Sequence, residues 1–309
     1  MLQNFTGSWR RPVSKAVYFA AWTAVSAATM LTIAHDRRVL AAGGVDGVDL
    51  SANPPVAWVE SAAANEERII HDDGSFPLRY RMHKVDTRND TTRDTIETRQ
   101  GAVARLVERN GQPITAAEDA LERERLNAML ASPSDFIKHH KRDDAARNYS
   151  LTLVRKLPHA MLFSYTPGQP QLPGASTPAV VIDFKPDPAF RPAAMIENVL
   201  TGLEGRAWID SKSRRVTRLE AHVLRPVDFG WGVVARVYPG GTVEFEQANA
   251  GGDRWAYSHL RSNLTVREMM LKTVQQKSQM DASSFQLLPA PVTYQEAVHI
   301  LLATPIPLR

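Results

Sequence analysis

The stretch GRAWIDSKSRRVTRLEAHVL, residues 205–224, decides the fold class of this chain. On either side of its polar centre, apolar residues alternate with polar or charged ones, and this period of two is typical of β-strands. The centre, residues 210–214, is polar and suits a turn. The stretch therefore predicts two strands around a turn, inside a longer β region over residues 203–263.

The same alternation appears earlier in the chain. It predicts three further strands, at residues 78–85, 91–100 and 102–108. The third strand closes at Asn110-Gly111, a pair that favours a tight turn because both residues tolerate positive φ. Strands joined by such short turns pair antiparallel, since parallel pairing requires long crossovers. An antiparallel meander is therefore expected here.

Further strands are expected on both sides of the central stretch. Before it, residues 159–166 and 179–184 predict two strands. After it, residues 233–238 and 242–247 are expected to form a hairpin over Pro239-Gly240-Gly241. Weaker strand patterns follow up to residue 280.

Helical patterns separate these blocks of strands. The helices are expected just after Pro55, from Thr115, over residues 134–157 and over residues 294–302. The hydroxyl of Thr115 can cap its helix while Glu118 completes a capping box, and Pro158 is expected to end the next helix. Strands in blocks, rather than in strict alternation with helices, predict an α+β fold.

The N-terminal residues 1–42 have the layout of an export signal. Arg10, Arg11 and Lys15 form a basic region, and an uncharged apolar run at residues 16–34 precedes small residues. The run is also long enough to span a bilayer as an uncleaved anchor, with its basic end in the cytoplasm. Both interpretations place the rest of the chain outside the cytoplasm, in the periplasm or cell envelope.

Composition and the Gly- and Pro-rich segments indicate the domain organisation, and composition also excludes several functions. The chain has 309 residues, no cysteine and a formal net charge of +4. Without cysteine it has no disulfide, thiolate metal site or thiol nucleophile. Its charges of both signs are interleaved, so no nucleic-acid partner is expected. Residues 43–55, rich in Gly, Asp and Pro, predict a linker, and residues 56–309 a single domain with a helical insertion at residues 115–157.

No common catalytic signature occurs in the sequence. The chain lacks G-x-S-x-G, H-E-x-x-H and the glycine loops that bind phosphates or dinucleotides. Residues 139–144 are metal-ligand types mixed with Lys and Arg, and they are interpreted as the solvent face of a helix. His222 and Asp228 could join Ser211 or Ser213 in a hydrolytic triad, but triads are recognised by geometry and local spacing gives no support. We therefore expect no catalytic residue, no metal and no cofactor.

Aromatic residues concentrate in the β region. Trp208 and Ile209 occupy opposite faces of one strand, and both are large. A strand that is apolar on both sides must be covered on both faces, or one face must line a pocket. The candidate cavity residues are Trp208, Phe229, Trp231, Phe245 and Trp255. A plain core packed against the helices is the alternative.

Several of these residues resemble the outer-membrane lipoprotein-sorting, or lipoprotein carrier, superfamily. The chain carries Gly205, Trp208-Ile209-Asp210, Ser213, Val216 and Leu219 in the pattern G-x-x-W-I-D-x-x-(S/T)-x-x-V-x-x-L. The resemblance implies a half-barrel, a curved antiparallel β-sheet covered by helices around an apolar cavity. It also implies lipoprotein transport or the sensing of lipid-like ligands, and no catalytic residues. This chain is longer than the simple carriers of that family.

Three hypotheses follow for the function. The first is a non-enzymatic periplasmic binder or carrier of lipid or acylated cargo, whose partners are acyl chains, an envelope protein and, through an uncleaved N-terminal segment, the membrane. The second is an envelope scaffold with a filled core and a partner-binding sheet edge. The third is an uncharacterised hydrolase. A connected apolar cavity would favour the first, and a filled interior the second.

Overall fold

The computed structural model of the protein describes residues 50–71, 77–230, 232–252 and 254–309. The predicted signal or anchor segment, the first part of the predicted linker and Trp231 lie outside the described residues. Within the described part of the chain, no helix is both long and apolar enough to cross a membrane.

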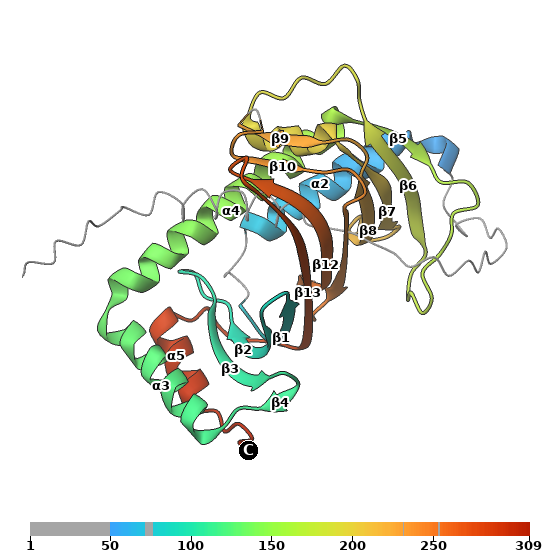
Figure 1. The fold of residues 1–309 in the computed structure, drawn as a ribbon. Helices are drawn as coiled ribbons and strands as arrows, with labels where there is room; N and C mark the ends of the chain where they lie inside the picture. Colours follow the sequence, from blue (N-terminus) through green and yellow to red (C-terminus); the bar gives the residue numbers. More distant parts are fainter. Residues whose placement is uncertain (1–49, 72–76, 231, 253) are drawn as a thin grey trace, which may run out of the picture.

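One large antiparallel sheet dominates the structure (Figure 1). Its strands are β1 (Leu78–Asp86), β2 (Asp90–Ile96), β3 (Val103–Arg109), β4 (Gln112–Pro113), β5 (Met161–Tyr165), β6 (Ala179–Pro186), β7 (Leu203–Asp210), β8 (Val216–Val223), β9 (Val227–Phe229), β10 (Ala235–Val237), β11 (Thr242–Asn249), β12 (Trp255–Glu268) and β13 (Lys272–Leu287). The order across the sheet is β4-β3-β2-β1-β13-β12-β11-β8-β7-β6-β5, with β9 and β10 attached beside β12. The sheet curves without closing into a barrel, so the predicted α+β fold with a curved antiparallel sheet is confirmed.

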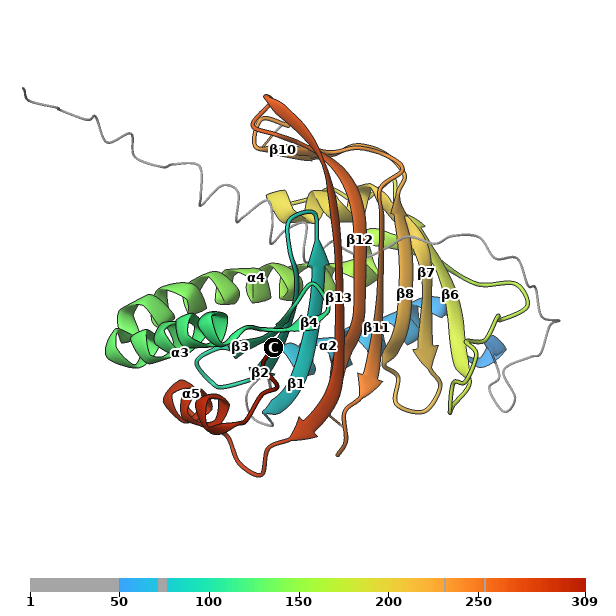
Figure 2. The same cartoon turned by 60° about the horizontal axis from the view of Figure 1, so that its bottom comes forward.

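The two longest strands join the ends of the sequence into one sheet. β13 pairs with β1 on one side and with β12 on the other, so the early meander continues into the later β region. Figure 2 shows both strands running through the middle of the sheet. The strand patterns that were weakest in the sequence, beyond residue 254, therefore form the centre of the fold.

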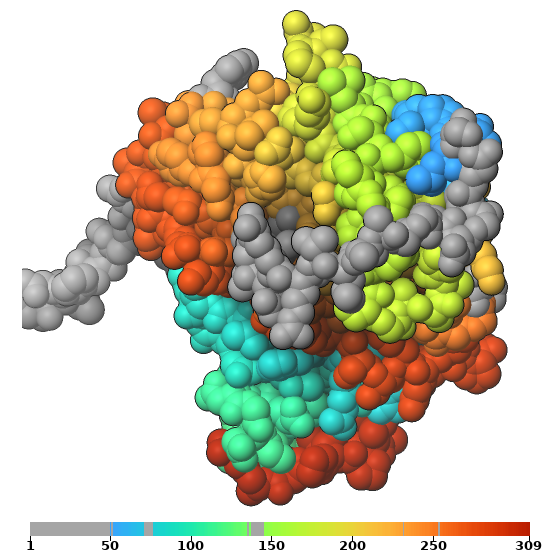
Figure 3. Space-filling view, turned by 90° about the vertical axis from the view of Figure 1, so that its right-hand side faces the viewer, coloured from blue at the N-terminus to red at the C-terminus, as the bar shows by residue number. Residues whose placement is uncertain are grey.

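In the described ranges, four α-helices and two 3₁₀ helices accompany the sheet. They are η1 (Leu50–Ala52), α2 (Pro55–His71), α3 (Ala116–Ala131), α4 (Pro133–Ala160), η2 (Met195–Thr201) and α5 (Tyr294–Ala303). α2 and α4 pack together and lie across the inner face of the β5–β8 side (Figure 1). α3 and α5 pack at the other end against β3, in a separate core that includes Ile96, Leu126 and Leu301. In the space-filling view, β1–β4 and α5 make up the lower part of the molecule (Figure 3).

The capping prediction for α3 is confirmed, and the predicted end of α4 is wrong. The Thr115 hydroxyl accepts the N–H of Glu118, and the Glu118 carboxylate accepts the N–H of Thr115. α4 passes through Pro158 and ends at Ala160. A proline in the last turn removes one helical hydrogen bond, and the burial of Ala160 and Met161 in the core outweighs that loss.

The predicted hairpin over Pro239-Gly240-Gly241 is also wrong. β10 and β11 lie one after the other along the same edge of β12, with Val237 opposite Val266 and Thr242 opposite Asn263. Pro239 has no N–H to donate to a ladder, so it interrupts the strand. β10 instead pairs with β9, and β11 pairs with β8. The proline and two glycines bend one long strand instead of reversing it.

Candidate ligand cavity

A cavity of about 280 Å³ lies between the inner face of the sheet and helices α2 and α4. Its volume is near the lower end of the range for small-molecule sites. Its described lining is apolar except for Glu66, Ser150 and Tyr257. The apolar lining residues are Val59, Ala62, Ala63, Ile70, Leu153, Val154, Leu157, Met161, Phe163, Ile182, Phe184, Val199, Leu200, Leu203, Ala207, Ile209, Val216, Leu219, Ala221, Phe245 and Leu260.

Helix α2 presents one continuous stripe to the cavity. The stripe consists of Val59, Ala62, Ala63, Glu66 and Ile70. Their spacing of three and four residues places them on the same face of a helix. Two alanines in the middle of the stripe leave space that larger side chains would fill.

The sheet lines the cavity through every second residue. Ala207 and Ile209 of β7 face inward, and so do Leu219 and Ala221 of β8. Gly205 of β7 is paired with Ala221 of β8. A Cβ added to Gly205 would lie 2.6 Å from the Cβ of Ala221. Small residues at these positions leave space between the inner face of β7 and β8 and the helices.

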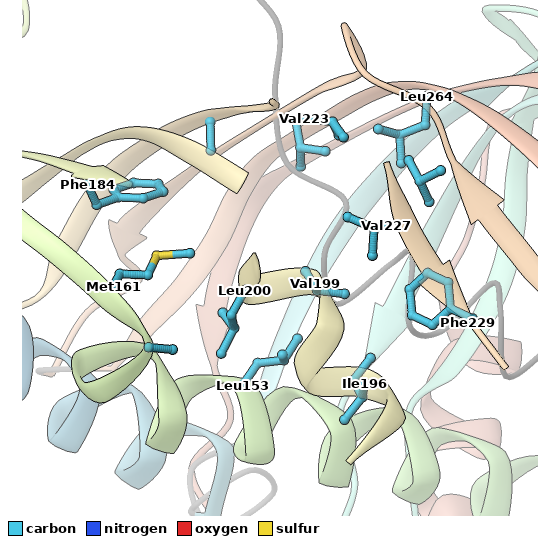
Figure 4. Close-up of a cluster of buried hydrophobic side chains, with 14 of the residues drawn as sticks. Leu153, Met161, Phe184, Ile196, Val199, Leu200, Val223, Val227, Phe229 and Leu264 are labelled. Atoms are coloured by element: carbon cyan, nitrogen blue, oxygen red, sulfur yellow. The ribbon is translucent and has the colours of Figure 1, made fainter. Parts of the chain in front are cut away.

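Helix α4 and η2 close the remaining side. Leu153 of α4 and Val199 and Leu200 of η2 line the cavity together with Met161 and Phe184. Figure 4 shows these five side chains around η2 and the end of α4. All five belong to one buried hydrophobic cluster, which extends from the cavity into a packed core.

A buried polar group stands at the wall of this apolar space. Glu66 is 9% exposed, and its carboxylate accepts hydrogen bonds from the amide of Gln247, at 2.8 Å, and from the hydroxyl of Tyr257. Gln247 is 6% exposed. α2 thereby connects to β11 and β12 through side chains that are far apart in the sequence.

Phe245 is the predicted cavity residue that the structure places in the lining. Its ring meets that of Tyr257 edge-on, with 5.4 Å between the centroids. Trp208 lies on the opposite face of β7 from Ala207 and Ile209. There it packs with Ala179 and Val181, and its indole N–H donates to the carbonyl of Pro170 at 2.8 Å.

Phe229 and Trp255 lie away from the lining. Phe229 is 1% exposed and packs in the core, on the other side of η2 from Met161 and Phe184 (Figure 4). Trp255 lies under the guanidinium of Arg215, 5.9 Å from the ring centre. The structure therefore distributes the described aromatic candidates over the cavity wall, the outer face and the packed core.

Sequence reasoning missed most of the lining because it followed aromatic residues. The actual wall is built mainly from aliphatic residues and alanines, and the strongly apolar stretch at residues 179–184, which supplies Ile182 and Phe184, was its clearest signal. Val59, Ala62 and Ala63 do follow helical spacing within the helix expected after Pro55. Glu66 continues the same spacing from Ala62 and Ala63, and an acid at that position was the available signal for the polar group.

The outer face of the sheet carries a depression of about 750 Å³ over β5–β8, whose lining includes charged side chains. Arg206 contacts Asp183 at 2.6 Å, and His222 contacts Glu204 at 2.5 Å. Burial raises the pKa of Glu220 above its usual value, against the lowering effect of Arg218. These groups already have side-chain partners, whereas the inner cavity has an apolar wall, so we regard the inner cavity as the candidate site.

The alternative catalytic residues do not meet in the structure. His222 is paired with Glu204, Asp228 with Arg236 at 2.6 Å, and the hydroxyl of Ser213 donates to Asp210. Within the described residues, no group of three or more His, Asp or Glu is arranged to hold a metal ion. The side chains of residues 139–144 lie outside the described part.

Comparison with known proteins gives a distant similarity of fold. No protein-family model and no curated protein sequence matches the chain. One similar structure is described as an outer membrane lipoprotein-sorting protein domain from Vibrio parahaemolyticus, with 9% identity, a TM-score of 0.31, and coverage of 78% of this chain and 97% of that chain. Another is MucB in complex with MucA(peri), with 8% identity, a TM-score of 0.22, and coverage of 77% and 100%. A likeness at this level assigns neither a family nor an activity.

Proposed function

We propose that the protein is a non-enzymatic binder or carrier of lipid or acylated cargo, which holds an apolar chain in the cavity between α2, α4 and the sheet. The observation that carries this proposal is the lining, in which apolar side chains from six strands, two helices and η2 face a common space. Apolar surface gains free energy when it is removed from water, so such a wall favours an apolar ligand.

The cost of an unfilled core supports the same proposal. Empty space inside a core destabilises a protein in proportion to its volume. Ala62, Ala63, Ala207 and Ala221 all stand at this wall, where larger apolar residues would fill the space. A ligand that fills the cavity replaces the missing contacts and stabilises the folded state by mass action.

An envelope location belongs to the proposal and is supported by the N-terminal sequence. The basic residues and apolar run of residues 1–42 are typical of an exported or anchored protein. Lipids and acylated proteins are abundant partners in that compartment. An envelope protein as a second partner stays a prediction.

The test compares two tryptophan substitutions on neighbouring residues of α2. Ala63 lines the cavity, whereas Ala64 is exposed on the other side of the helix. The protein and the variants Ala63→Trp and Ala64→Trp are purified, and binding of the fluorescent apolar probe N-phenyl-1-naphthylamine is titrated. Organic extracts of the same preparations are analysed by mass spectrometry for co-purified lipid.

The protein and Ala64→Trp are expected to bind the probe and to carry lipid, and Ala63→Trp is expected to lose both. Circular dichroism spectra show whether the three proteins share one fold. Failure of the wild-type protein to bind the probe, or undiminished binding by a folded Ala63→Trp, would overturn the proposal.

A further inference from the structure

We infer that Glu66 determines the head group of the ligand: the cavity accepts an apolar chain that ends in a hydrogen-bond donor, such as an amine, amide or hydroxyl, and discriminates against a free carboxylate. This inference rests on the proposed function and makes it more specific. The volume of the cavity and its apolar wall indicate only that an apolar chain can bind. Glu66 determines which head group that chain can carry.

Glu66 is a buried acid in an apolar part of the cavity wall. It lies in the cavity stripe of α2, with apolar Ala62, Ala63 and Ile70 as its neighbours on that face. It is 9% exposed, so water does not surround its carboxylate. Buried polar groups are normally satisfied by hydrogen bonds, and a polar residue in an apolar wall therefore calls for partners.

The protein satisfies only part of the hydrogen-bonding capacity of this carboxylate. Its Oε2 accepts from Gln247 Nε2 at 2.8 Å, and its Oε1 accepts from the hydroxyl of Tyr257. A carboxylate offers about four lone-pair positions. Acceptor positions therefore remain for a donor that arrives with a ligand.

The amide of Gln247, which donates to Glu66, has an acceptor of its own that no described residue satisfies. Its Oε1 is buried and has no hydrogen-bond partner among the described residues. Exchange of the amide oxygen and nitrogen would direct the oxygen at the Glu66 carboxylate, so the orientation with Nε2 on Glu66 is the favourable one. Glu66 lines the cavity and Gln247 lies outside the lining, so the ligand donor is expected to meet the Glu66 carboxylate, while Gln247 holds that carboxylate in place.

The charge of the wall excludes an anionic head group. Among the described residues that line the cavity, Glu66 is the only acid, and no Lys, Arg or His belongs to the set. A ligand carboxylate at this position would face another carboxylate without a cation between them, and like charges repel strongly where water is excluded. An ammonium group would instead gain a charge-assisted hydrogen bond.

The test uses three probes that share one chain and differ in the head group. Decylamine, decanol and decanoate compete with N-phenyl-1-naphthylamine near neutral pH, on the full protein and on the variants Glu66→Gln and Glu60→Gln. Glu66→Gln keeps the size of the side chain and removes its charge. Glu60 is exposed on the same helix and outside the lining, so Glu60→Gln is the matched control.

We expect the wild-type protein to bind decylamine and decanol at least about tenfold more tightly than decanoate, as the loss of a charge-assisted hydrogen bond predicts. Glu66→Gln should narrow this difference, mainly through tighter binding of decanoate, and Glu60→Gln should leave it unchanged. The comparison of the three probes on the wild-type protein needs no variant, so it stands even if Glu66→Gln folds poorly.

The outcomes separate this inference from the proposed function. Equal binding of all three probes, or a preference for decanoate, would overturn the role of Glu66 and leave the apolar binder in place. A preference for the amine that persists unchanged in folded Glu66→Gln would also overturn it. If neither the fluorescent probe nor any decyl compound binds, both the proposed function and this inference fail.

Discussion

Arg105 donates a hydrogen bond of 2.7 Å to Asp119, and the two residues join β3 to α3 inside the protein. The Arg105 side chain is 1% exposed and also donates to the carbonyls of Leu301 and Thr304, at 2.5 and 2.8 Å. One guanidinium therefore ties a strand, a helix and the C-terminal end of α5 together. Three acceptors surround one buried cation, and this network is the polar centre of the core between β3, α3 and α5.

The first prediction concerns this network. Arg105→Met should lower the free energy of unfolding by about 3–5 kcal/mol, because it leaves buried Asp119 without its principal partner. Arg123→Met is the matched control, since Arg123 contacts the same carboxylate at 2.8 Å but is 44% exposed. Its loss should cost about 0–1 kcal/mol. Urea unfolding of both variants measures the two values, and equal losses would contradict the role of burial.

The second prediction is a loss of stability in acid. Burial works to raise the pKa of Asp119, but hydrogen bonds and charge from Arg105 and Arg123 outweigh it and hold the pKa below its usual value. The same holds for Glu122, where burial is outweighed by Arg125 and the N–H of Leu106. A lowered pKa in the folded state contributes stability above the unfolded pKa, and this contribution disappears as the pH falls through the folded value.

The unfolding free energy should therefore decline as the pH falls below about 4, the unfolded carboxyl value. The variants Asp119→Asn and Glu122→Gln should start from a lower stability and decline less steeply. Thermal unfolding at a series of pH values provides the slopes, and a wild-type stability that stays level or rises in acid would contradict the argument.

The third prediction concerns the turn between β12 and β13. Met269 and Met270 have φ values of 49° and 58°. These lie in the left-handed backbone region that residues other than Gly and Asn rarely adopt. The turn between β3 and β4 uses Asn110-Gly111 at similar angles, 52° and 68°. The double variant Met269→Asn/Met270→Gly should therefore raise the free energy of unfolding by about 1 kcal/mol.

The Asn-Gly turn gives the matched comparison. Asn110→Ala/Gly111→Ala should destabilise the protein by about 1 kcal/mol or more per residue, because alanine pays the cost of left-handed backbone. Urea midpoints for the two double variants should shift in opposite directions. A shift in the same direction for both would mean that backbone angles do not control these turns.

The fourth prediction concerns the start of β6, residues 179–181, which extend beyond the pairing with β5 and where two glutamine side chains replace a neighbouring strand. The Gln169 amide accepts the N–H of Val181 and donates to its carbonyl, both at 2.8 Å. Gln171 does the same for Ala179, at 2.8 and 2.9 Å. The side chains thus occupy the backbone groups that an unprotected edge would offer to another molecule.

Gln169→Leu should cost about 1–3 kcal/mol, because the buried N–H of Val181 loses its acceptor. Gln171→Leu should cost less, since Gln171 is exposed and water can replace it. Light scattering at increasing protein concentration should show more association for Gln169→Leu than for Gln171→Leu. Unchanged stability together with unchanged association would show that the edge needs no such protection.

Sequence alone was informative where structure depends on neighbours in the chain. The alternation around residues 205–224 predicted β7 and β8, and Thr115 with Glu118 predicted the start of α3. The turn at Asn110-Gly111 follows in the same way from the backbone angles these residues tolerate. Each of these features is stabilised mainly by contacts within a few residues, so each leaves a pattern in the sequence.

Only the tertiary structure decided which strands pair and which faces meet. Pro239-Gly240-Gly241 reads as a turn, yet the pairing of β10 and β11 with β12 makes it an interruption in one strand. Alternation placed Trp208 and Ile209 on opposite faces, but the position of α2 and α4 selected the face of Ile209 for the cavity. Glu66 meets Gln247 from 181 positions away. Such contacts depend on the packing of whole elements, which no local period of the sequence encodes.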